Sequence, residues 1–197
     1  MIHDHRHRSS ETNEFDLIAR AQEGDDNALE ILIHTHLNQV YYFILQLNKN
    51  PKDAEDIAQE TFIKMWKKLS HYKPTGKFTT WLLTIARNTT IDWMRKRRDY
   101  SFSEFEDEEG NNTIADRVTS EETPPDELLL QAEEKRHMHM LLGQLPTLYR
   151  EVVFLRYEEH LSFEEIGTIL HKPANTVRSQ HNRALIALRK LVAHAPK

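Results

Sequence analysis

Residues 145–190 constrain the fold of this chain more than any other segment, because they encode two helices separated by a very short break. Ser162 stands three residues before Glu165, and this pair can form a capping box that starts a helix. We expect that helix to cover Phe163–Leu170. Pro173 follows shortly afterwards and cannot continue the hydrogen-bond ladder, so the segment predicts a tight turn at this point.

The second helix of this segment has two distinct faces. We expect Asn175 to cap it and Thr176 to be its first residue. Its apolar stripe consists of Val177, Ala184, Leu185, Leu188 and Leu191. Its other face offers the hydrogen-bonding side chains Arg178, Ser179, Gln180, Asn182 and Arg183. This arrangement favours binding in the major groove of duplex DNA. The alternative is a helical hairpin whose polar face is simply solvated.

The composition predicts an all-α protein, because glycine and proline number only 5 and 7 and long stretches repeat apolar residues at helical spacing. A length of 197 residues is enough for two small domains. The sequence contains no apolar run near the ~20 residues that cross a bilayer, and its polar N-terminus is unlike a signal peptide. We therefore expect a cytoplasmic protein with no direct membrane insertion.

Charge is distributed unevenly along the chain, whose formal net charge is -5. Residues 101–135 hold 12 acidic and 2 basic side chains, whereas the remainder holds 19 acidic and 24 basic ones. We interpret residues 99–126, which are acidic and lack a core-forming period, as a flexible linker. The modest positive charge of the remainder implies few phosphate contacts, so a partner would supply most of the grip on DNA.

The N-terminal residues 1–13 are interpreted as a disordered tail. His3, His5 and His7 could bind a metal ion, but no cysteine or defined scaffold accompanies them. We expect neither a metal site nor a cofactor. The linker then separates a first helical block over residues 14–98 from a second block over residues 127–197, which contains the two helices described above.

Three helices are predicted in the first block: one over residues 28–47, one over residues 51–69 capped by Asn50, and one over residues 79–98. A loop over residues 70–77 joins the last two. In the helix over residues 51–69 the predicted core residues are Ala54, Ile57, Ala58, Phe62, Met65 and Leu69. In the helix over residues 79–98 they are Phe78, just before it, and Leu82, Ile85, Ala86 and Met94.

An acidic face with one apolar residue lies along the helix over residues 51–69. Its members are Asp53, Asp56, Gln59, Glu60, Ile63 and Lys67. Such a face suits a protein partner with a basic groove or a coiled coil. The alternative is an ordinary solvated face in which Glu60 pairs with Lys64 across one turn.

Aromatic and cationic side chains are mixed in the loop and in the helix that follows it. The aromatic members are Tyr72, Trp81 and Trp93, and the cationic ones are Lys73, Lys77, Arg87 and the basic run Arg95 to Arg98. Mixtures of this kind bind single-stranded DNA, because bases stack on the rings while cations follow the backbone. The alternative is that both tryptophans belong to the core and the basic run complements the helix C-terminus.

Three segments, in this order and spacing, resemble the extracytoplasmic-function sigma factors of the sigma-70 family. DAEDIAQETFIKMW is similar to the helix of sigma region 2 that binds the polymerase clamp, and FTTWLLTIARNTTIDWMRKRR to the promoter-melting helix of the same region. LSFEEIGTILHKPANTVRSQHNRAL is similar to the helix-turn-helix of sigma region 4. The resemblance covers residues 14–98 and 127–191, and it implies two helical domains joined by the acidic linker.

The resemblance implies partners and roles. Core RNA polymerase would be bound through its beta-prime clamp and beta subunits, and an anti-sigma factor could hold the protein inactive. Clamp binding would involve Asp53, Asp56, Gln59, Glu60 and Ile63. Capture of single-stranded promoter DNA at the minus-ten element would involve Tyr72, Lys73, Thr75, Lys77, Phe78, Trp81, Arg87, Asn88 and Arg95. Recognition of the minus-thirty-five element would involve Thr176, Arg178, Ser179, Gln180, Asn182 and Arg183.

The function implied is that of an RNA polymerase sigma factor, which directs promoter recognition and transcription initiation and is not an enzyme. One alternative is a stand-alone helix-turn-helix transcriptional regulator, but no dimerisation helix is evident in the sequence. Another is a nuclease, but the acidic residues form no metal-ligand spacing in a folded segment. Gln180 and Leu185 stand where many relatives carry arginine, which implies a weaker phosphate grip or a different base preference.

Overall fold

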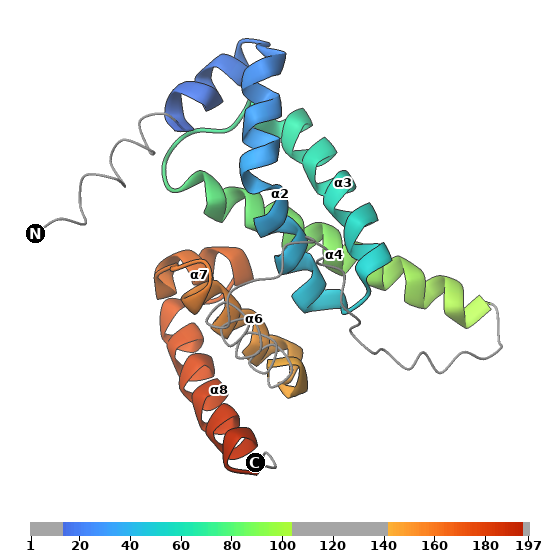
Figure 1. Ribbon diagram of the computed structural model, residues 1–197, viewed down its shortest axis with the longest axis vertical. Helices are drawn as coiled ribbons and strands as arrows, with labels where there is room; N and C mark the ends of the chain where they lie inside the picture. The colour runs from blue at the N-terminus through green and yellow to red at the C-terminus, as the bar shows by residue number, and fades with distance from the viewer. Residues whose placement is uncertain (1–13, 104–141, 195–197) are drawn as a thin grey trace, which may run out of the picture. The chain divides into compact units, whose positions relative to one another are not determined.

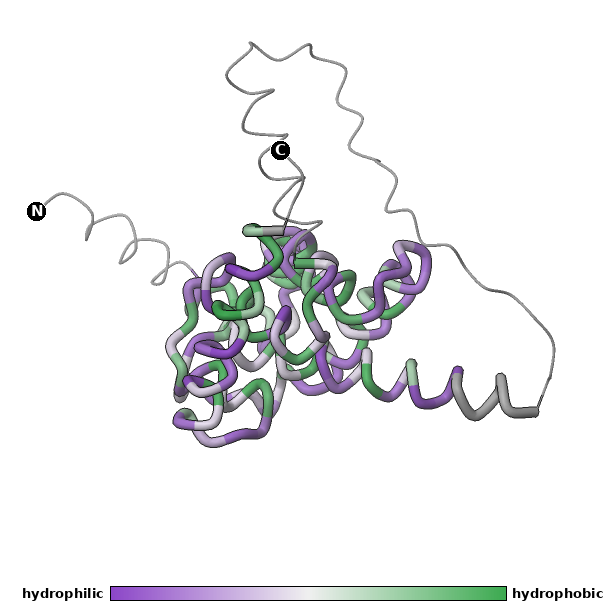
Figure 2. Tube along the Cα trace, turned by 90° about the horizontal axis from the view of Figure 1, so that it is seen from below, coloured by the Kyte–Doolittle hydropathy of each residue, from purple (hydrophilic) through white to green (hydrophobic). Residues whose placement is uncertain are grey.

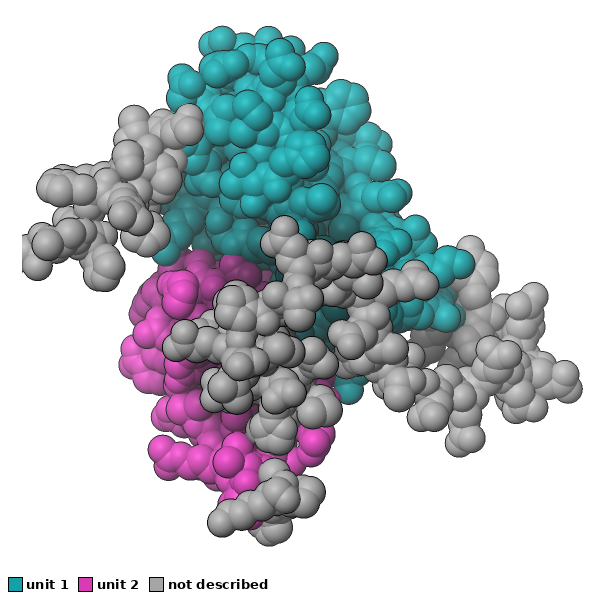
Figure 3. All heavy atoms as spheres, in the orientation of Figure 1, with its two compact units in different colours: residues 1–106 teal, residues 107–197 magenta. Residues whose placement is uncertain are grey.

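The computed structural model describes residues 14–103 and 142–194, which fall into two compact units (Figure 3). Unit 1 comprises residues 1–106 and unit 2 residues 107–197. All regular structure in the described residues is helical, as the sequence predicts. None of the described helices is long and apolar enough to cross a membrane. The predicted tail over residues 1–13 and the linker residues 104–126 lie outside the described residues.

Unit 1 is a bundle of α2 (Asp26–Asn48), α3 (Pro51–Leu69) and α4 (Phe78–Ser103), each packed against the other two (Figure 1). A shorter helix over residues 14–22 precedes them. The largest fully buried side chains of the unit are Leu32, Phe43, Ile44, Ile57, Met65, Leu69, Phe78, Leu82 and Leu83. Apolar and polar residues alternate along the helices in short stretches (Figure 2), as expected where each helix buries one face.

The ends of these helices follow from local side-chain chemistry. Asn50 caps α3, because its side chain accepts hydrogen bonds from the backbone N–H groups of Lys52 and Asp53, and Pro51 is the first helical residue. The predicted cap and bounds of α3 are therefore confirmed. Asp25 caps α2 in the same way and is held by Arg20, whose guanidinium lies 2.6 Å from the carboxylate. The hydrogen bond from Arg20 lowers the pKa of Asp25.

The predicted core of α3 is confirmed at all six positions, and buried Thr61 joins them. The prediction for α4 needs two corrections. The helix begins at Phe78 and continues past Arg98 to Ser103, so residues 99–103 of the expected linker are helical. Met94 was predicted to be a core residue but is 44% exposed. Figure 1 shows the C-terminal turns of α4 running out beyond α2 and α3, so these turns have fewer neighbouring helices to bury their side chains.

Unit 2 contains α6 (Thr147–Tyr157), α7 (Phe163–Leu170) and α8 (Ala174–His194), and α8 packs against both of the others. One apolar cluster joins Leu142, Leu145, Val153 and Ala184, with Leu188 and Leu191 packed against it. The guanidinium of Arg150 is buried on α6 and donates to Gly143 O at 3.4 Å and to Thr147 Oγ1 at 3.2 Å. Burial lowers the pKa of Arg150.

Candidate functional site

The helix-turn-helix of unit 2 starts with the predicted capping box. The Glu165 backbone N–H donates to Ser162 Oγ at 3.2 Å, and the Ser162 backbone N–H donates to Glu165 Oε2 at 2.6 Å. The helix that follows, α7, has the predicted bounds, Phe163–Leu170. The sequence rule that located this helix therefore rests on an interaction that the structure contains.

The turn between α7 and α8 depends on a close backbone approach. His171 adopts a left-handed conformation with φ 53°, and the Lys172 N–H donates to Gly167 O at 2.9 Å. A Cβ atom added to Gly167 would lie 2.6 Å from the carbonyl oxygen of Lys172. Position 167 therefore accepts only glycine without a shift of the backbone.

The start of α8 differs from the prediction. The Pro173 carbonyl already accepts hydrogen bonds from the N–H groups of Thr176 at 2.9 Å and Val177 at 3.1 Å. The helix consequently begins at Ala174, and Asn175 is a residue of its first turn rather than its cap. The sequence pattern predicts a later start because Asn175 has a capping side chain, whereas a proline can stand directly before a helix.

Most of the predicted reading face of α8 is open to solvent. The exposed members are Thr176, Arg178, Ser179, Asn182 and Arg183. Gln180 is half-buried, and its Oε1 is buried with no hydrogen-bond partner in the described part of the chain. On the opposite side Val177 and Ala184 are fully buried, and Leu185, Leu188 and Leu191 are half-buried. The predicted faces are thus correct, except that Gln180 lies at their boundary.

Phe163, the first residue of α7, contacts a residue of the proposed reading face. Its ring is flanked by the guanidinium carbons of Arg156, at 4.9 Å from the centroid, and of Arg178, at 5.3 Å. The Arg156 guanidinium also donates to Leu161 O at 2.7 Å. Stacking engages the flat face of a guanidinium and leaves its in-plane N–H donors free. The spacing of residues within each helix does not predict this contact, because α7 and α8 come together only in the folded unit.

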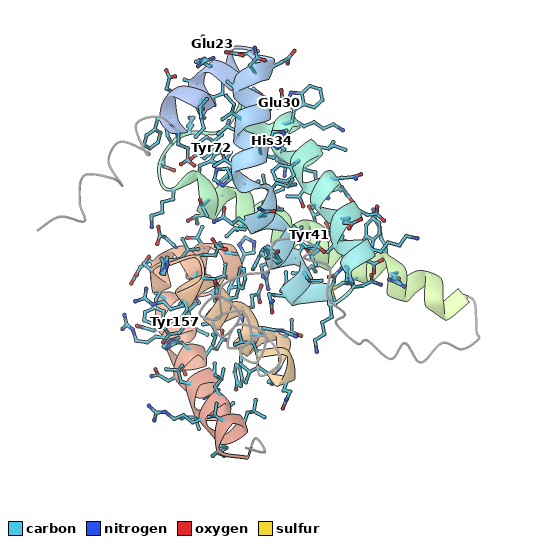
Figure 4. All side chains as sticks on the ribbon, viewed as in Figure 1. Glu23, Glu30, His34, Tyr41, Tyr72 and Tyr157 are labelled. Carbon is cyan, nitrogen blue, oxygen red and sulfur yellow. The ribbon has the colours of Figure 1, made fainter. Side chains whose placement is uncertain are left out.

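A second aromatic pair adjoins this cluster. Tyr157, labelled in Figure 4, stacks on His181 with ring centroids 5.6 Å apart, and its hydroxyl is hydrogen-bonded to His181 Nε2 at 3.1 Å. The His181 ring also meets Phe163 edge to face at 5.3 Å. Aromatic contacts therefore join the end of α6, the start of α7 and the first half of α8.

Two carboxylates of the predicted acidic face of α3 are already engaged in ion pairs within the protein. Asp56 and Gln59 are exposed. Glu60 forms an ion pair with Lys64 at 2.8 Å, which is the pairing that the alternative interpretation required. Asp53 forms an ion pair with Arg97 of α4.

An apolar patch lies on the same helix and is larger than predicted. Ile63 is 51% exposed, and Trp66, one turn further on, is 60% exposed. The predicted acidic face includes Ile63 but not Trp66. The spacing in the sequence could have predicted this patch, because residues three apart, such as Ile63 and Trp66, are neighbours on the surface of a helix. An exposed tryptophan beside isoleucine and acidic side chains is a surface suited to a protein partner.

The loop over residues 70–77 rests on an aromatic cluster. Tyr72 is 8% exposed and Phe78 is 1% exposed. Trp81 is half-buried, with its ring centroid 4.7 Å from that of Tyr72 and 5.4 Å from that of Phe78. The Tyr72 hydroxyl donates to Gly76 O at 3.2 Å. Burial, and less strongly the charge of Glu14, raise the pKa of Tyr72.

These positions divide the predicted single-strand residues into two groups. Lys73, Thr75 and Lys77 are exposed on the loop, whereas Tyr72 and Phe78 lie beneath it. Further along α4, Asn88 and Arg95 are exposed and Arg87 and Trp93 are half-buried. Arg95 forms an ion pair with Asp92 at 3.1 Å. The interpretation of Trp81 and Trp93 as core residues is thus correct in part, since both are half-covered.

The described residues hold no group of three or more histidine, aspartate or glutamate side chains arranged to bind a metal ion. His3, His5 and His7 lie outside them.

Two family models match the chain. Sigma-70 region 2 matches residues 32–100, and Sigma-70, region 4 matches residues 136–188. Among curated proteins, the ECF RNA polymerase sigma factor SigW of Bacillus subtilis is 33% identical over 175 residues, which cover 88% of this chain and 93% of SigW. The ECF RNA polymerase sigma-E factor of Escherichia coli is 31% identical over 174 residues, which cover 87% of this chain and 90% of that protein.

Solved structures share the fold. The sigma factor RpoE of Bartonella quintana, in complex with the anti-sigma factor NepR, matches with a TM-score of 0.63 and 25% identity over 85% of this chain and 98% of RpoE. CnrH, in complex with the cytosolic domain of CnrY, matches with a TM-score of 0.62 and 23% identity over 91% of this chain and 97% of CnrH.

Proposed function

The chain belongs to the extracytoplasmic-function sigma factors of the sigma-70 family, and we propose from this a division of labour between its two units. As a member of that family it directs transcription initiation by RNA polymerase and is not itself an enzyme. In our proposal the segment over residues 14–98 docks on the polymerase and holds unpaired promoter bases. The segment over residues 127–197 reads duplex DNA upstream.

Docking on core polymerase is assigned to the exposed side of α3. Asp56 and Gln59 would meet a basic surface of the beta-prime clamp, and Ile63 would provide apolar contact area. Asp53 and Glu60 contribute negative charge but are already ion-paired, so the partner's cations would share them with Arg97 and Lys64. Exposed Trp66 extends the apolar part of this surface. A mixed acidic and apolar face supports binding to a protein better than binding to DNA, since phosphates would be repelled.

Capture of the melted strand is assigned to the loop between α3 and α4. Lys73, Thr75 and Lys77 are the exposed loop side chains that a flipped base or its phosphates would reach. Buried Tyr72 and Phe78, with half-buried Trp81, would support the loop from below. Extruding a base costs a few kcal/mol, which contacts from a preformed loop must offset. The strand would continue along α4 past Arg87, Asn88 and Arg95.

Reading of the upstream duplex is assigned to α8. Thr176, Arg178, Ser179, Asn182 and Arg183 offer donors and acceptors from one exposed face. Half-buried Gln180 would contribute at the edge of that face. This face, presented after the capping box and the tight turn at Gly167, is the observation that carries the proposal. A helix presented in this way fits the major groove, where each base pair displays a distinct donor and acceptor pattern.

Control by an anti-sigma factor is proposed from the solved relative. RpoE of Bartonella quintana is bound to the anti-sigma factor NepR. A protein of that kind could cover the exposed apolar side chains Ile63 and Trp66 and so block polymerase binding. Promoter DNA, core polymerase and an anti-sigma factor are thus the partners proposed for this chain.

Selection from a pool of random DNA duplexes tests the proposal, with the full chain used alone or bound to core polymerase. We expect enrichment only with the polymerase present, of two sequence blocks at a fixed separation. Enrichment of a single palindromic site by the chain alone would instead favour a stand-alone helix-turn-helix regulator, because such proteins bind as symmetric dimers. Core polymerase without the chain is the control, and it should enrich neither pattern.

A further inference from the structure

The helix over residues 14–22 lies against the loop proposed to capture the unpaired base (Figure 1). Its apolar residues Leu17 and Ile18 are buried in unit 1, which fixes the helix on the bundle. At its C-terminal end, Gln22 Nε2 donates to Leu69 O at 2.8 Å and to Tyr72 O at 2.9 Å. One amide group therefore joins the last residue of α3 to the third residue of the segment that follows it.

The same helix also contacts the other end of the loop, indirectly through His36 of α2. Glu14 Oε1 lies 3.0 Å from Nε2 of the buried His36 on α2. The His36 ring packs against Phe78, the first residue of α4, with centroids 5.3 Å apart. Together with Gln22, this places the helix in contact with the loop's start directly and with its end through His36.

The backbone at the start of the loop lacks the regular partners of a helix. The last carbonyls of a helix have no intrahelical donor, and a loop containing Pro74 and Gly76 forms no ladder of its own. The Tyr72 N–H donates to Leu69 O at 3.0 Å, so Gln22 supplies a second donor to that oxygen and another to Tyr72 O. Tyr72 then reaches across the loop to Gly76 O. The chain of contacts from Gln22 through Tyr72 defines the shape of the loop.

We propose that Gln22 is a positioning residue for single-strand recognition, which it serves by holding the loop over residues 70–77 in its binding shape before DNA arrives. The proposal rests on the function proposed above for that loop. A loop that is already ordered loses less conformational entropy on binding, so removal of its anchor weakens capture without removing any contact to the base. The Gln22 side chain donates to two backbone carbonyls, Leu69 O at the end of α3 and Tyr72 O in the loop, so it acts on the base contacts through the shape of the loop.

The test measures binding of holoenzyme, made from core polymerase and the full chain, to single-stranded oligonucleotides. One oligonucleotide carries the downstream block of a promoter selected as described above, and the other carries the same bases scrambled. The measured quantity is the ratio of the two affinities. Gln22→Met keeps the length of the side chain and removes both donors. Gln22→Lys restores a donor that can reach both carbonyls. Gln46→Met, at a half-buried α2 glutamine whose side chain makes no hydrogen bond within the described part of the chain, is the matched control.

We expect Gln22→Met to lower the affinity ratio by roughly three- to tenfold, which is less than the full effect of losing two ordinary hydrogen bonds because the bonds of Tyr72 to Leu69 O and Gly76 O still order the loop. Gln22→Lys should restore most of the ratio, and Gln46→Met should leave it unchanged, as should the affinity of Gln22→Met for core polymerase. An unchanged ratio in Gln22→Met overturns the inference. So does an equal loss in Gln46→Met, or a failure of Gln22→Lys to restore the ratio, since either would indicate a general loss of structure.

A loop variant separates failure of this inference from failure of the proposed function. Lys73→Ala removes an exposed cationic side chain from the loop itself. If Lys73→Ala lowers the affinity for the promoter oligonucleotide and Gln22→Met leaves the ratio unchanged, the loop captures DNA without help from Gln22, and the inference alone is overturned. If neither variant has an effect, the function proposed for the loop fails and the inference fails with it.

Discussion

In the helix-turn-helix, Gly167 faces the carbonyl oxygen of Lys172 so closely that a Cβ atom at position 167 would lie 2.6 Å from it. Lys172 in turn donates its N–H to Gly167 O at 2.9 Å, and His171 between them is left-handed. The two residues therefore set how tightly α7 and α8 approach, and with it the direction in which α8 presents Arg178 and Asn182.

Gly167→Ala should destabilise unit 2 by about 1–3 kcal/mol, because the added methyl group would overlap the Lys172 backbone, and shifting that backbone costs free energy. Denaturant unfolding of the full chain, followed by a probe in unit 2, measures this. Gly143→Ala is the matched control, since a Cβ there would meet nothing within 4 Å. It should be neutral or slightly stabilising. Equal stability of the Gly167→Ala and wild-type chains would contradict the role given to this contact.

Charge reversal on α3 tests the polymerase surface. Asp56→Arg combined with Glu60→Arg should weaken binding to core polymerase by at least about tenfold, since like charges placed opposite one another cost several kcal/mol. Glu23→Arg with Glu30→Arg makes the same change in net charge at sites outside the proposed surface (Figure 4). Affinity is measured by titration of labelled core polymerase at fixed salt. Similar affinities for the two double variants would remove the assignment of this face to the clamp.

Arg178→Ala should lose discrimination at one upstream base pair by ~1–3 kcal/mol, if its guanidinium makes a bidentate contact to a base. Holoenzyme binding to duplexes that carry every single substitution in the upstream block measures this. Arg189→Ala, at an exposed α8 residue outside the proposed reading set, is the control. A uniform loss across all duplexes for Arg178→Ala would identify Arg178 as a phosphate contact instead.

Phe163→Leu should reproduce part of the Arg178→Ala effect, by about 0.5–1 kcal/mol, because the ring lies 5.3 Å from the Arg178 guanidinium and orients it. Phe163→Tyr keeps an aromatic ring and should retain the discrimination. In the double variant Phe163→Leu with Arg178→Ala, the two losses should not add. Full additivity would mean that the ring and the guanidinium act independently.

Local rules were sufficient for much of the fold. The capping box at Ser162 and the cap at Asn50 located α7 and α3 to the residue, because each is an interaction between neighbours in sequence. The start of α8 was predicted at Thr176, two residues too late, because the rule required a capping side chain at Asn175. The burial of Met94 was predicted from periodicity alone, which carries no information about where neighbouring helices end.

Less of the candidate site than of the fold could be predicted from the sequence. The aromatic and cationic pattern selected Tyr72, and the family resemblance Phe78, as candidate contacts to DNA, and the structure buries both. The ion pair of Asp53 with Arg97 joins residues on different helices, as does the stacking of Arg178 on Phe163. Pairings of this kind depend on how helices pack, so no pattern within a single helix could predict them.

Run-off transcription from sheared genomic DNA of the source organism tests the central claim most directly, with bacterial core polymerase in the presence and absence of the full chain and with start sites mapped. New starts that depend on the protein and share two upstream sequence blocks are the result predicted for a sigma factor with this division of labour. The absence of any new start, with a folded protein and an active core polymerase, would contradict it.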